Sequence, residues 1–269
     1  DDKVLNLATS SDIPTLDLSK ATDQQSFQTA NTTMEGLTRV DAEGKVQPGV
    51  AESWETSEDG LTWTFKLRKN STWSNGTPVT AHDFEYSWKR TLTPETAAEY
   101  SYIMADIVGS STKEIQENGV DGVGVKALDD YTLEVKLNRP VAYFAELVSF
   151  QVFFPQNQAF VESCGDAYGS AADKQLYNGP FTLTSWKMED QFTMEKNPNY
   201  WDAANVKLNK INTKVVKDTG AEVSLYEAGQ IDRAILSSDY VDKYKDSKEL
   251  KTREVASIFM LQINGGNHK

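Results

Sequence analysis

The sequence predicts an α/β protein, and three observations lead to this prediction. Apolar and polar residues alternate over residues 61–68 (LTWTFKLR) and again over 129–137 (DDYTLEVKL), the period-two pattern of half-buried strands. Between them, residues 80–90 (TAHDFEYSWKR) begin with a helix-start signal and place apolar side chains four apart. Strand, helix and strand patterns then follow one another over residues 209–236, which indicates a βαβ unit.

Length and composition fit a soluble, globular chain. The 269 residues are enough for about two domains, and the hydrophobic content is 39% with 6 Trp, 11 Tyr and 11 Phe. The net charge of −13 disfavours nucleic acid or an anionic membrane as partner, because such partners attract basic surfaces. No apolar run reaches the roughly 18 residues of a membrane span. The chain opens without a signal peptide pattern, so we expect any leader to have been removed or left out.

Cysteine and histidine usage argues against redox and metal chemistry. Cys164 is the single cysteine, so no internal disulfide can form, and we expect it to be an inert packed thiol. The two histidines are His82 and His268, too few for a structural zinc site. We therefore expect no metal and no cofactor.

The N-terminal elements are expected in this order. One strand lies near the start of residues 3–17 and leads into a turn-rich loop. A short helical turn follows in residues 31–37 (NTTMEGL), with Asn31 or Thr32 as N-cap and Gly36 as terminator.

The middle of the chain carries sharper signals. Asn75 and Gly76 favour a tight reversal after the strand at 61–68. Thr80 and Asp83 have the spacing of a capping box for the helix that follows.

The remaining expected elements are a short helix, two paired strands, and the strand, helix and strand of the βαβ unit, followed by one more strand. They fall in residues 139–148, 178–201, 209–218, 219–229, 230–236 and 257–264.

Catalytic motifs are missing from the sequence: it has no GxSxG, no phosphate-binding loop and no GxGxxG. Carboxylates could form a glycosidase pair only if two came within about 5–10 Å, and we expect solvated acids instead; the candidates are Glu35, Asp41, Glu52 and Asp83. Four tryptophans fall within 35 residues on apolar faces, and we expect them in the core; they are Trp54, Trp63, Trp73 and Trp88. Tyr100 lies outside such a stripe, on a connecting segment, and is the better candidate for ligand contact.

Residues 49–90 resemble the signature region of the oligopeptide-binding family of ABC-transporter substrate-binding proteins, the peptide/nickel class. The resemblance rests on AESW, WTFKLRK, WSNGTPVTAHDF and YSW. It continues through MEGL and VQPGVAESW before these motifs, and through NGPFTL, NPNYWD, EAGQID and FMLQIN after them. It therefore extends over nearly the whole chain.

The resemblance implies a periplasmic-binding-protein-like fold of the class II type. In that fold two lobes close over the ligand about a hinge, and the first lobe carries an additional α+β domain. The resemblance places residues 1–35 and 157–269 in domain I and residues 36–156 in the additional domain. The change in pattern near Leu37 and Pro155 falls in the same places.

Family chains continue through a second lobe, which this chain is expected to lack. The chain is then a fragment that ends where the family crosses the hinge, at Asn264, Gly265 and Gly266.

The resemblance also implies the ligand site. A polar segment of domain I supplies an edge that pairs with the peptide backbone, and here the corresponding residues are Ala21, Thr22, Asp23 and Gln24. Thr22 stands where relatives carry an acidic residue, so a salt link to the peptide ends is not expected there. Tyr100 matches a ligand-lining tyrosine of the additional domain.

The implied function is an extracytoplasmic receptor, not an enzyme, that binds extended oligopeptides and delivers them to a membrane ABC permease. It would be a monomer, either a cell-surface lipoprotein or periplasmic. Two alternatives remain: the same receptor fold with a non-peptide ligand (an oligosaccharide, a nickel chelate or haem), and a carbohydrate hydrolase suggested by the acids and tryptophans.

Overall fold

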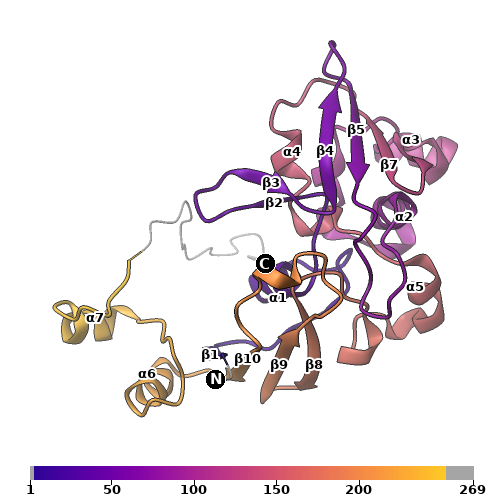
Figure 1. Cartoon of the computed structure of the whole chain (residues 1–269). Helices are drawn as coiled ribbons and strands as arrows, with labels where there is room; N and C mark the ends of the chain where they lie inside the picture. The colour runs from indigo at the N-terminus through magenta and orange to yellow at the C-terminus, as the bar shows by residue number, and fades with distance from the viewer. Residues whose placement is uncertain (1–2, 253–269) are drawn as a thin grey trace, which may run out of the picture. The chain divides into compact units, whose positions relative to one another are not determined.

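The computed structural model describes residues 3–252 of the chain (Figure 1). Residues up to Ala234 form one compact unit, and Ile235 begins a second. The described part of the second unit contains one helix, α7 (Ser238–Tyr244). The predicted strand at 257–264 and the predicted hinge at Asn264, Gly265 and Gly266 lie outside the described residues.

The first sheet of the larger unit joins the beginning of the chain to its last third. Its strand order is β1-β10-β9-β8, with β1 parallel to β10 and the other pairs antiparallel. The strands are β1 (Val4–Thr9), β8 (Phe181–Lys187), β9 (Gln191–Lys196) and β10 (Lys210–Val215). All four fall in the two segments predicted to form domain I.

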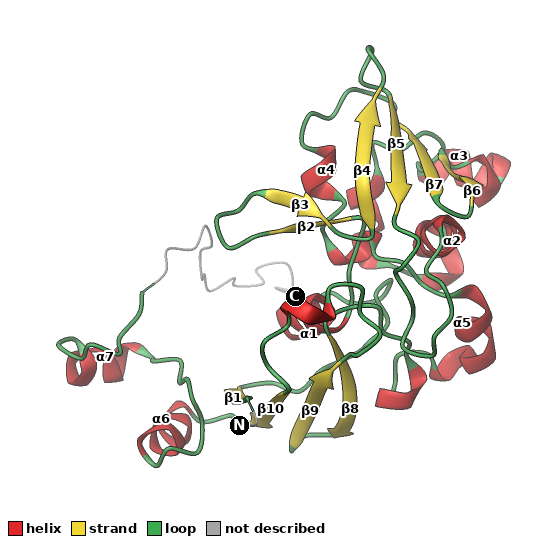
Figure 2. Cartoon of the chain, in the orientation of Figure 1, coloured by secondary structure: helices red, strands yellow, loops and turns green. Residues whose placement is uncertain are grey.

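A second, antiparallel sheet forms from the middle of the chain, in the order β4-β5-β7-β6 (Figure 2). Its strands are β4 (Ala51–Thr56), β5 (Thr62–Leu67), β6 (Val125–Asp129) and β7 (Thr132–Lys136). The alternation predicted for β5 is confirmed, because Trp63, Phe65 and Leu67 are buried while Lys66 is exposed. These strands fall within the predicted additional domain, whose exact boundaries stay a prediction.

Helix α2 (Ala81–Leu92) covers this sheet through contacts with β6 and β7. The predicted capping box is present between Thr80 and Asp83. Phe84 and Trp88, four residues apart, are both fully buried. The local sequence signal and the tertiary burial therefore agree for this helix.

The remaining elements connect the two sheets or lie around them. A small sheet pairs β2 (Thr38–Val40) with β3 (Val46–Pro48). The other helices are α1 (Gln24–Thr33), α3 (Thr112–Asn118), α4 (Phe144–Leu147), α5 (Gln158–Cys164) and α6 (Thr219–Glu227). Short 3-10 helices occur at Pro94–Thr96, Glu99–Met104, Val120–Gly122, Gln151–Phe153, Gly165–Ala167, Ala172–Lys174 and Ala203–Asn205.

Helix α1 corrects the prediction of a short helical turn at 31–37. The helix begins after its N-cap Asp23 and ends at Thr33, so Asn31 and Thr32 lie in its last turn and cap nothing. Its buried residues are small or polar, namely Ser26, Thr29, Ala30 and Thr33. Such a face gives no apolar period, which is why the sequence pattern missed the helix.

The strand predicted at 230–236 is also wrong, since that segment has no strand in the structure. Asp232 does lie beside β1, where its N–H donates to the Asn6 carbonyl at 2.8 Å. The Asn6 N–H then donates to the Asp232 carboxylate at 2.7 Å instead of to a backbone carbonyl. The Asp232 side chain thus makes the second hydrogen bond that a strand partner would make with its backbone, and no strand pairing forms there.

The core runs continuously between the two sheets. Trp63, Trp73 and Trp88 are at most 8% exposed, and Trp54 packs against the same cluster half-buried. The predicted core role of the four tryptophans is confirmed.

Candidate functional site

The segment predicted to bind ligand, residues 21–24, links a tight turn to helix α1. The turn is closed by the N–H groups of Lys20 and Ala21, which both donate to the Asp17 carbonyl, at 3.1 and 3.0 Å. Ala21 is buried and Thr22 is exposed. The side chain of Ala21 therefore anchors the segment, and Thr22 meets the solvent.

Asp23 and Gln24 begin the helix. Asp23 has an extended backbone, and its carboxylate accepts a hydrogen bond from the Ser26 N–H at 2.8 Å, as an N-cap does. Gln24 is the first helical residue and its side chain is exposed. Asp23 thus has the extended backbone that strand-like pairing needs, whereas Gln24 is already helical.

A buried polar network holds the turn before this segment. Arg90, on α2, donates to both carboxylate oxygens of Asp17 at 2.8 Å and to the Gln156 amide oxygen at 2.9 Å. The Gln156 amide nitrogen donates to the hydroxyls of Ser19 and Ser87 at 2.8 and 3.0 Å. These contacts fix the candidate ligand segment against helix α2, and the sequence pattern gave no sign of them.

Tyr100 lies against this segment, so the structure brings together two residues predicted to bind ligand. Its hydroxyl donates to the Thr22 carbonyl oxygen at 3.3 Å. Its ring stacks on Phe27 of α1 with 5.7 Å between centroids and lies 6.1 Å from the ring of Phe150. Phe27 and Phe150 are themselves 5.1 Å apart, edge to face. The three rings form an aromatic cluster between α1 and residues of the middle segment.

Phe27 and Phe150 were missed by the sequence analysis. They lie 73 and 50 positions from Tyr100 in the chain, and neither belongs to a motif that singles it out. Only the packing of α1 against the 3-10 turn Gln151–Phe153 brings them together.

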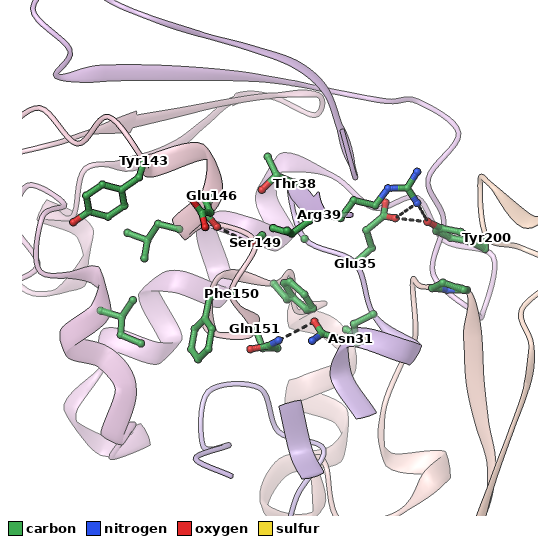
Figure 3. Close-up of a pocket in the computed structure, with 17 residues that line it drawn as sticks. Asn31, Glu35, Thr38, Arg39, Tyr143, Glu146, Ser149, Phe150, Gln151 and Tyr200 are labelled. Atoms are coloured by element: carbon green, nitrogen blue, oxygen red, sulfur yellow. Dashed lines mark hydrogen bonds and ion pairs between the residues drawn. The ribbon is translucent and has the colours of Figure 1, made fainter. Parts of the chain in front are cut away.

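A cavity of about 830 Å³ opens beside this cluster (Figure 3). Its wall is formed by the end of α1, the loop after it, β2, and residues 143–154 around α4. Phe150 belongs both to the cavity wall and to the aromatic cluster. The cavity therefore continues the surface that Tyr100 and Phe27 begin.

A buried carboxylate, Glu35, lies at one end of the cavity (Figure 3). It accepts hydrogen bonds from the Tyr200 hydroxyl and from the Trp201 indole, the latter at 2.7 Å. Arg39 lies 3.8 Å away, and Arg68 stacks on Trp201 at 3.5 Å from the ring centroid. Burial raises the pKa of Glu35 above its ordinary value, and the hydrogen bonds from Tyr200 and Trp201 offset part of that rise.

The acids considered for glycoside hydrolysis have structural roles. Glu35 is held by Tyr200 and Trp201, and Asp83 accepts from the Trp73 indole at 3.1 Å and from the Thr80 N–H at 2.9 Å. Asp41 accepts from the Gln47 amide at 2.8 Å within the β2–β3 turn, and Glu52 is exposed. Nothing in these contacts points two of the four carboxyls at a common substrate.

Residues 3–252 show neither a metal-binding cluster nor a membrane-spanning helix. In that range no three or more His, Cys, Asp or Glu side chains are grouped so that they could hold a metal ion. No helix there has the length and apolar character needed to cross a membrane. The single thiol, Cys164, is free and half-buried.

The two sheets, the added middle segment and the site at their junction define a substrate-binding protein fold. Residues 45–268 match the model of the bacterial extracellular solute-binding proteins, family 5, middle region, and the chain belongs to this family. The predicted family and α/β fold class are confirmed.

Similar proteins are named for peptide binding. The chain is 37% identical to the oligopeptide-binding protein OppA of Bacillus subtilis over 91% of this chain and 46% of that protein. It is 38% identical to the dipeptide-binding protein of Lactococcus lactis, over 97% of this chain and 48% of that protein. The chain thus spans about half the length of the curated relatives it matches.

Solved structures show the same fold. The substrate-binding domain of an oligopeptide ABC transporter from Bacillus anthracis matches with a TM-score of 0.90 and 48% identity, over 92% of this chain and 48% of that chain. Listeria monocytogenes OppA bound to peptide matches with a TM-score of 0.89 and 42% identity, over 92% and 49%.

Proposed function

We propose that this chain forms one side of the ligand site of an extracytoplasmic oligopeptide receptor. The observation that carries the proposal is the contact between Tyr100 and Thr22, at 3.3 Å. It unites the two elements that the family resemblance assigns to ligand binding, although they lie 78 residues apart. Membership in a solute-binding family, with relatives named for oligopeptide and dipeptide binding, supports peptide as the ligand class.

Peptide backbone would pair with the main chain of residues 21–24. The Thr22 carbonyl has a second lone pair besides the one facing Tyr100, and an extended ligand can donate to it. The N–H of Gln24, at the first position of α1, has no partner within the helix and can donate to a ligand carbonyl. Pairing through main-chain groups tolerates varied ligand sequences, which suits a receptor for many peptides.

The receptor would act as a monomer outside the cytoplasm, in the periplasm or anchored as a lipoprotein, and deliver its peptide to a membrane ABC permease. The family's description as bacterial extracellular solute-binding proteins supports that location. An enzyme is disfavoured because the acids nearest the site are held in structural contacts.

A non-peptide ligand is a second candidate, favoured by one observation. The chain is 34% identical to a protein of Escherichia coli named as a probable deoxycholate-binding periplasmic protein, over 82% of this chain and 42% of that protein. The same family fold is thus associated with more than one ligand class.

Calorimetry on two proteins would test the peptide proposal. The first is this chain, and the second is a chimera in which the chain replaces the matched residues of the Bacillus subtilis relative. With a mixed tripeptide library we expect measurable binding by the chimera and much weaker binding by the chain alone, because closure needs both sides of a cleft. Binding of deoxycholate but of no peptide would reject the proposal. Micromolar or tighter peptide binding by the chain alone would reject the two-sided mechanism.

A further inference from the structure

The exposed face of α1 connects the predicted backbone-pairing segment to the cavity. Gln24, Gln28 and Asn31 are all exposed and lie at positions i, i+4 and i+7, so they form one stripe along the helix. Asn31 lines the cavity at the far end of this stripe. A peptide held at residues 21–24 would therefore have the cavity within reach of one of its side chains.

Gln151, in the cavity wall, carries a polar atom that the protein itself does not use. The side chain is 6% exposed, and its amide nitrogen donates to the Asn31 side-chain oxygen at 2.8 Å (Figure 3). Its amide oxygen is buried and has no hydrogen-bond partner within residues 3–252. Buried oxygens are normally satisfied, so an unsatisfied one on a residue of the cavity wall is a candidate acceptor for a donor that a ligand brings into the cavity.

Three charged side chains line the cavity, and two of them pair with each other while the third, Glu146, does not. Glu35 and Arg39 face each other at 3.8 Å, and Arg39 also lies 3.4 Å from Asp202. Glu146 lines the same cavity, is exposed, and has no ion-pair partner within the described part of the chain. A cationic group entering the cavity would therefore meet an acid that is free to pair with it.

The rest of the wall suits an apolar stem. Ile103, Leu147 and Phe150 all contribute to it. Its volume of about 830 Å³ lies within the roughly 300–1,000 Å³ of ligand pockets. Lysine and arginine side chains combine an apolar stem with a head that only donates hydrogen bonds.

We propose that this cavity is a subsite for a basic side chain of the ligand, with Gln151 and Glu146 as the residues that recognise its head. The inference rests on the proposed peptide-binding function and names the side-chain chemistry that one part of the site selects. A glutamate side chain would bring a second carboxylate toward Glu146, and a purely apolar one would leave the Gln151 oxygen unpaired. Both should bind more weakly than lysine.

The test uses alanine tripeptides in which lysine, norleucine or glutamate stands at each position in turn. Norleucine keeps the stem of lysine and lacks its charge. Binding is measured by calorimetry on the chimera and by NMR titration of the whole 269-residue chain, which detects weak binding. We expect lysine at one position to bind at least about tenfold more tightly than norleucine, since a charged hydrogen bond is gained.

Two variants assign the effect to the named residues. Glu146→Gln, at an exposed position, and Gln151→Leu should each reduce the preference for lysine over norleucine several-fold. Glu58→Gln, an exposed acid in the β4–β5 turn, is the matched control and should leave that preference unchanged. Gln151→Leu should change the melting temperature of the unliganded protein only slightly, because it removes an unsatisfied buried oxygen together with one hydrogen bond, to the exposed Asn31.

The outcomes separate this inference from the proposed function. Equal binding of lysine and norleucine peptides at every position, or a preference that survives both cavity variants, would overturn the basic subsite while leaving peptide binding in place. Failure of every tripeptide to bind the chimera would overturn the proposed function, and the subsite with it.

Discussion

Asp17 and Arg90 form a nearly buried pair in which both carboxylate oxygens accept hydrogen bonds of 2.8 Å from the guanidinium. The Asp17 side chain is 4% exposed and that of Arg90 17%. The pair joins the turn before Ala21 to helix α2, so the candidate ligand segment depends on an ion pair between distant parts of the sequence.

Replacing Arg90 by methionine should destabilise the protein strongly. The Asp17 carboxylate would stay buried without its partner, which costs about 3–5 kcal/mol of unfolding free energy. Arg139→Met is the matched control, because Arg139 also binds both oxygens of an aspartate, Asp106, but is 59% exposed. Urea unfolding followed by circular dichroism measures both. Similar losses of unfolding free energy in the two variants would show that burial does not determine how much such an ion pair contributes to stability.

Gln24→Pro tests whether main-chain groups of the candidate segment contact the ligand. Proline is well tolerated at the first position of a helix, so α1 should survive while one N–H is lost. Tripeptide binding by the chimera should weaken, whereas Gln24→Ala, which keeps the N–H, should bind normally. Unchanged affinity in the proline variant would remove the Gln24 N–H from the site.

Substitutions of Asp23 test the N-cap of α1. Because it is the N-cap of α1, Asp23→Ala should cost about 1 kcal/mol of stability, and Asp23→Asn should restore most of it. Thermal unfolding of the two variants measures the cap. An alanine variant as stable as the parent would mean that the cap contributes nothing to α1.

The buried carboxyl of Asp83 should make stability depend on pH. Burial raises its pKa from 3.8 to about 6, against the hydrogen bonds from Thr80 and Trp73. The folded state therefore holds this proton more tightly than the unfolded state. The associated stability is present below pH 3.8 and is lost as the pH rises toward 6, by about 3 kcal/mol at roughly 1.4 kcal/mol per pKa unit.

Asp83→Asn isolates this contribution. The same carboxylate oxygen accepts from both Trp73 and Thr80, so an asparagine oxygen can replace it in both bonds. Urea unfolding at pH 4 and pH 7 should show a smaller decline for the variant than for the parent. Parallel declines would indicate that Asp83 titrates alike in the folded and unfolded states.

Gly179→Ala should disturb the end of α1. A Cβ at this position would lie 2.5 Å from the Met34 nitrogen and 2.6 Å from the Thr33 carbonyl carbon, both backbone atoms. Relieving the clash should cost about 1–3 kcal/mol. Gly122→Ala, whose Cβ would meet only the Asn118 side chain at 3.4 Å, serves as the control in the same unfolding measurement. Equal stability of both variants would show that the helix end shifts freely.

Much of the fold could be predicted from the sequence because local pattern and tertiary burial agree there. In β5 and α2 the period of apolar residues and the capping box specify the element before any packing is considered. The predicted helix at 219–229 is confirmed for the same reason, since Asp218 caps α6 and Gly229 follows it with a φ of 69°.

Helix α1 could not be predicted from the period of apolar residues. Its hydroxyl side chains at Thr29, Thr32 and Thr33 bond back to carbonyls four residues earlier, so residues with weak helix propensity cover their polar groups within the helix. The burial of such a face depends on what packs against it, and no local pattern reports that.

The candidate site could be predicted only in part. Tyr100 and residues 21–24 came from the family resemblance, and the structure places Tyr100 against Thr22. Phe150 and Gln151 belong to the site only because two distant segments meet, so no local period or motif could identify them.

The small buried face of α1 has a consequence for how ligand preference could change. Ser26, Ala30 and Thr33 leave little room for substitution, so the backbone of the helix is fixed by close steric fit. The outward positions Gln24, Gln28 and Asn31 are free of that steric constraint and lead from the candidate ligand segment to the cavity. A combinatorial library at these three positions should therefore yield receptors of altered selectivity on an unchanged scaffold.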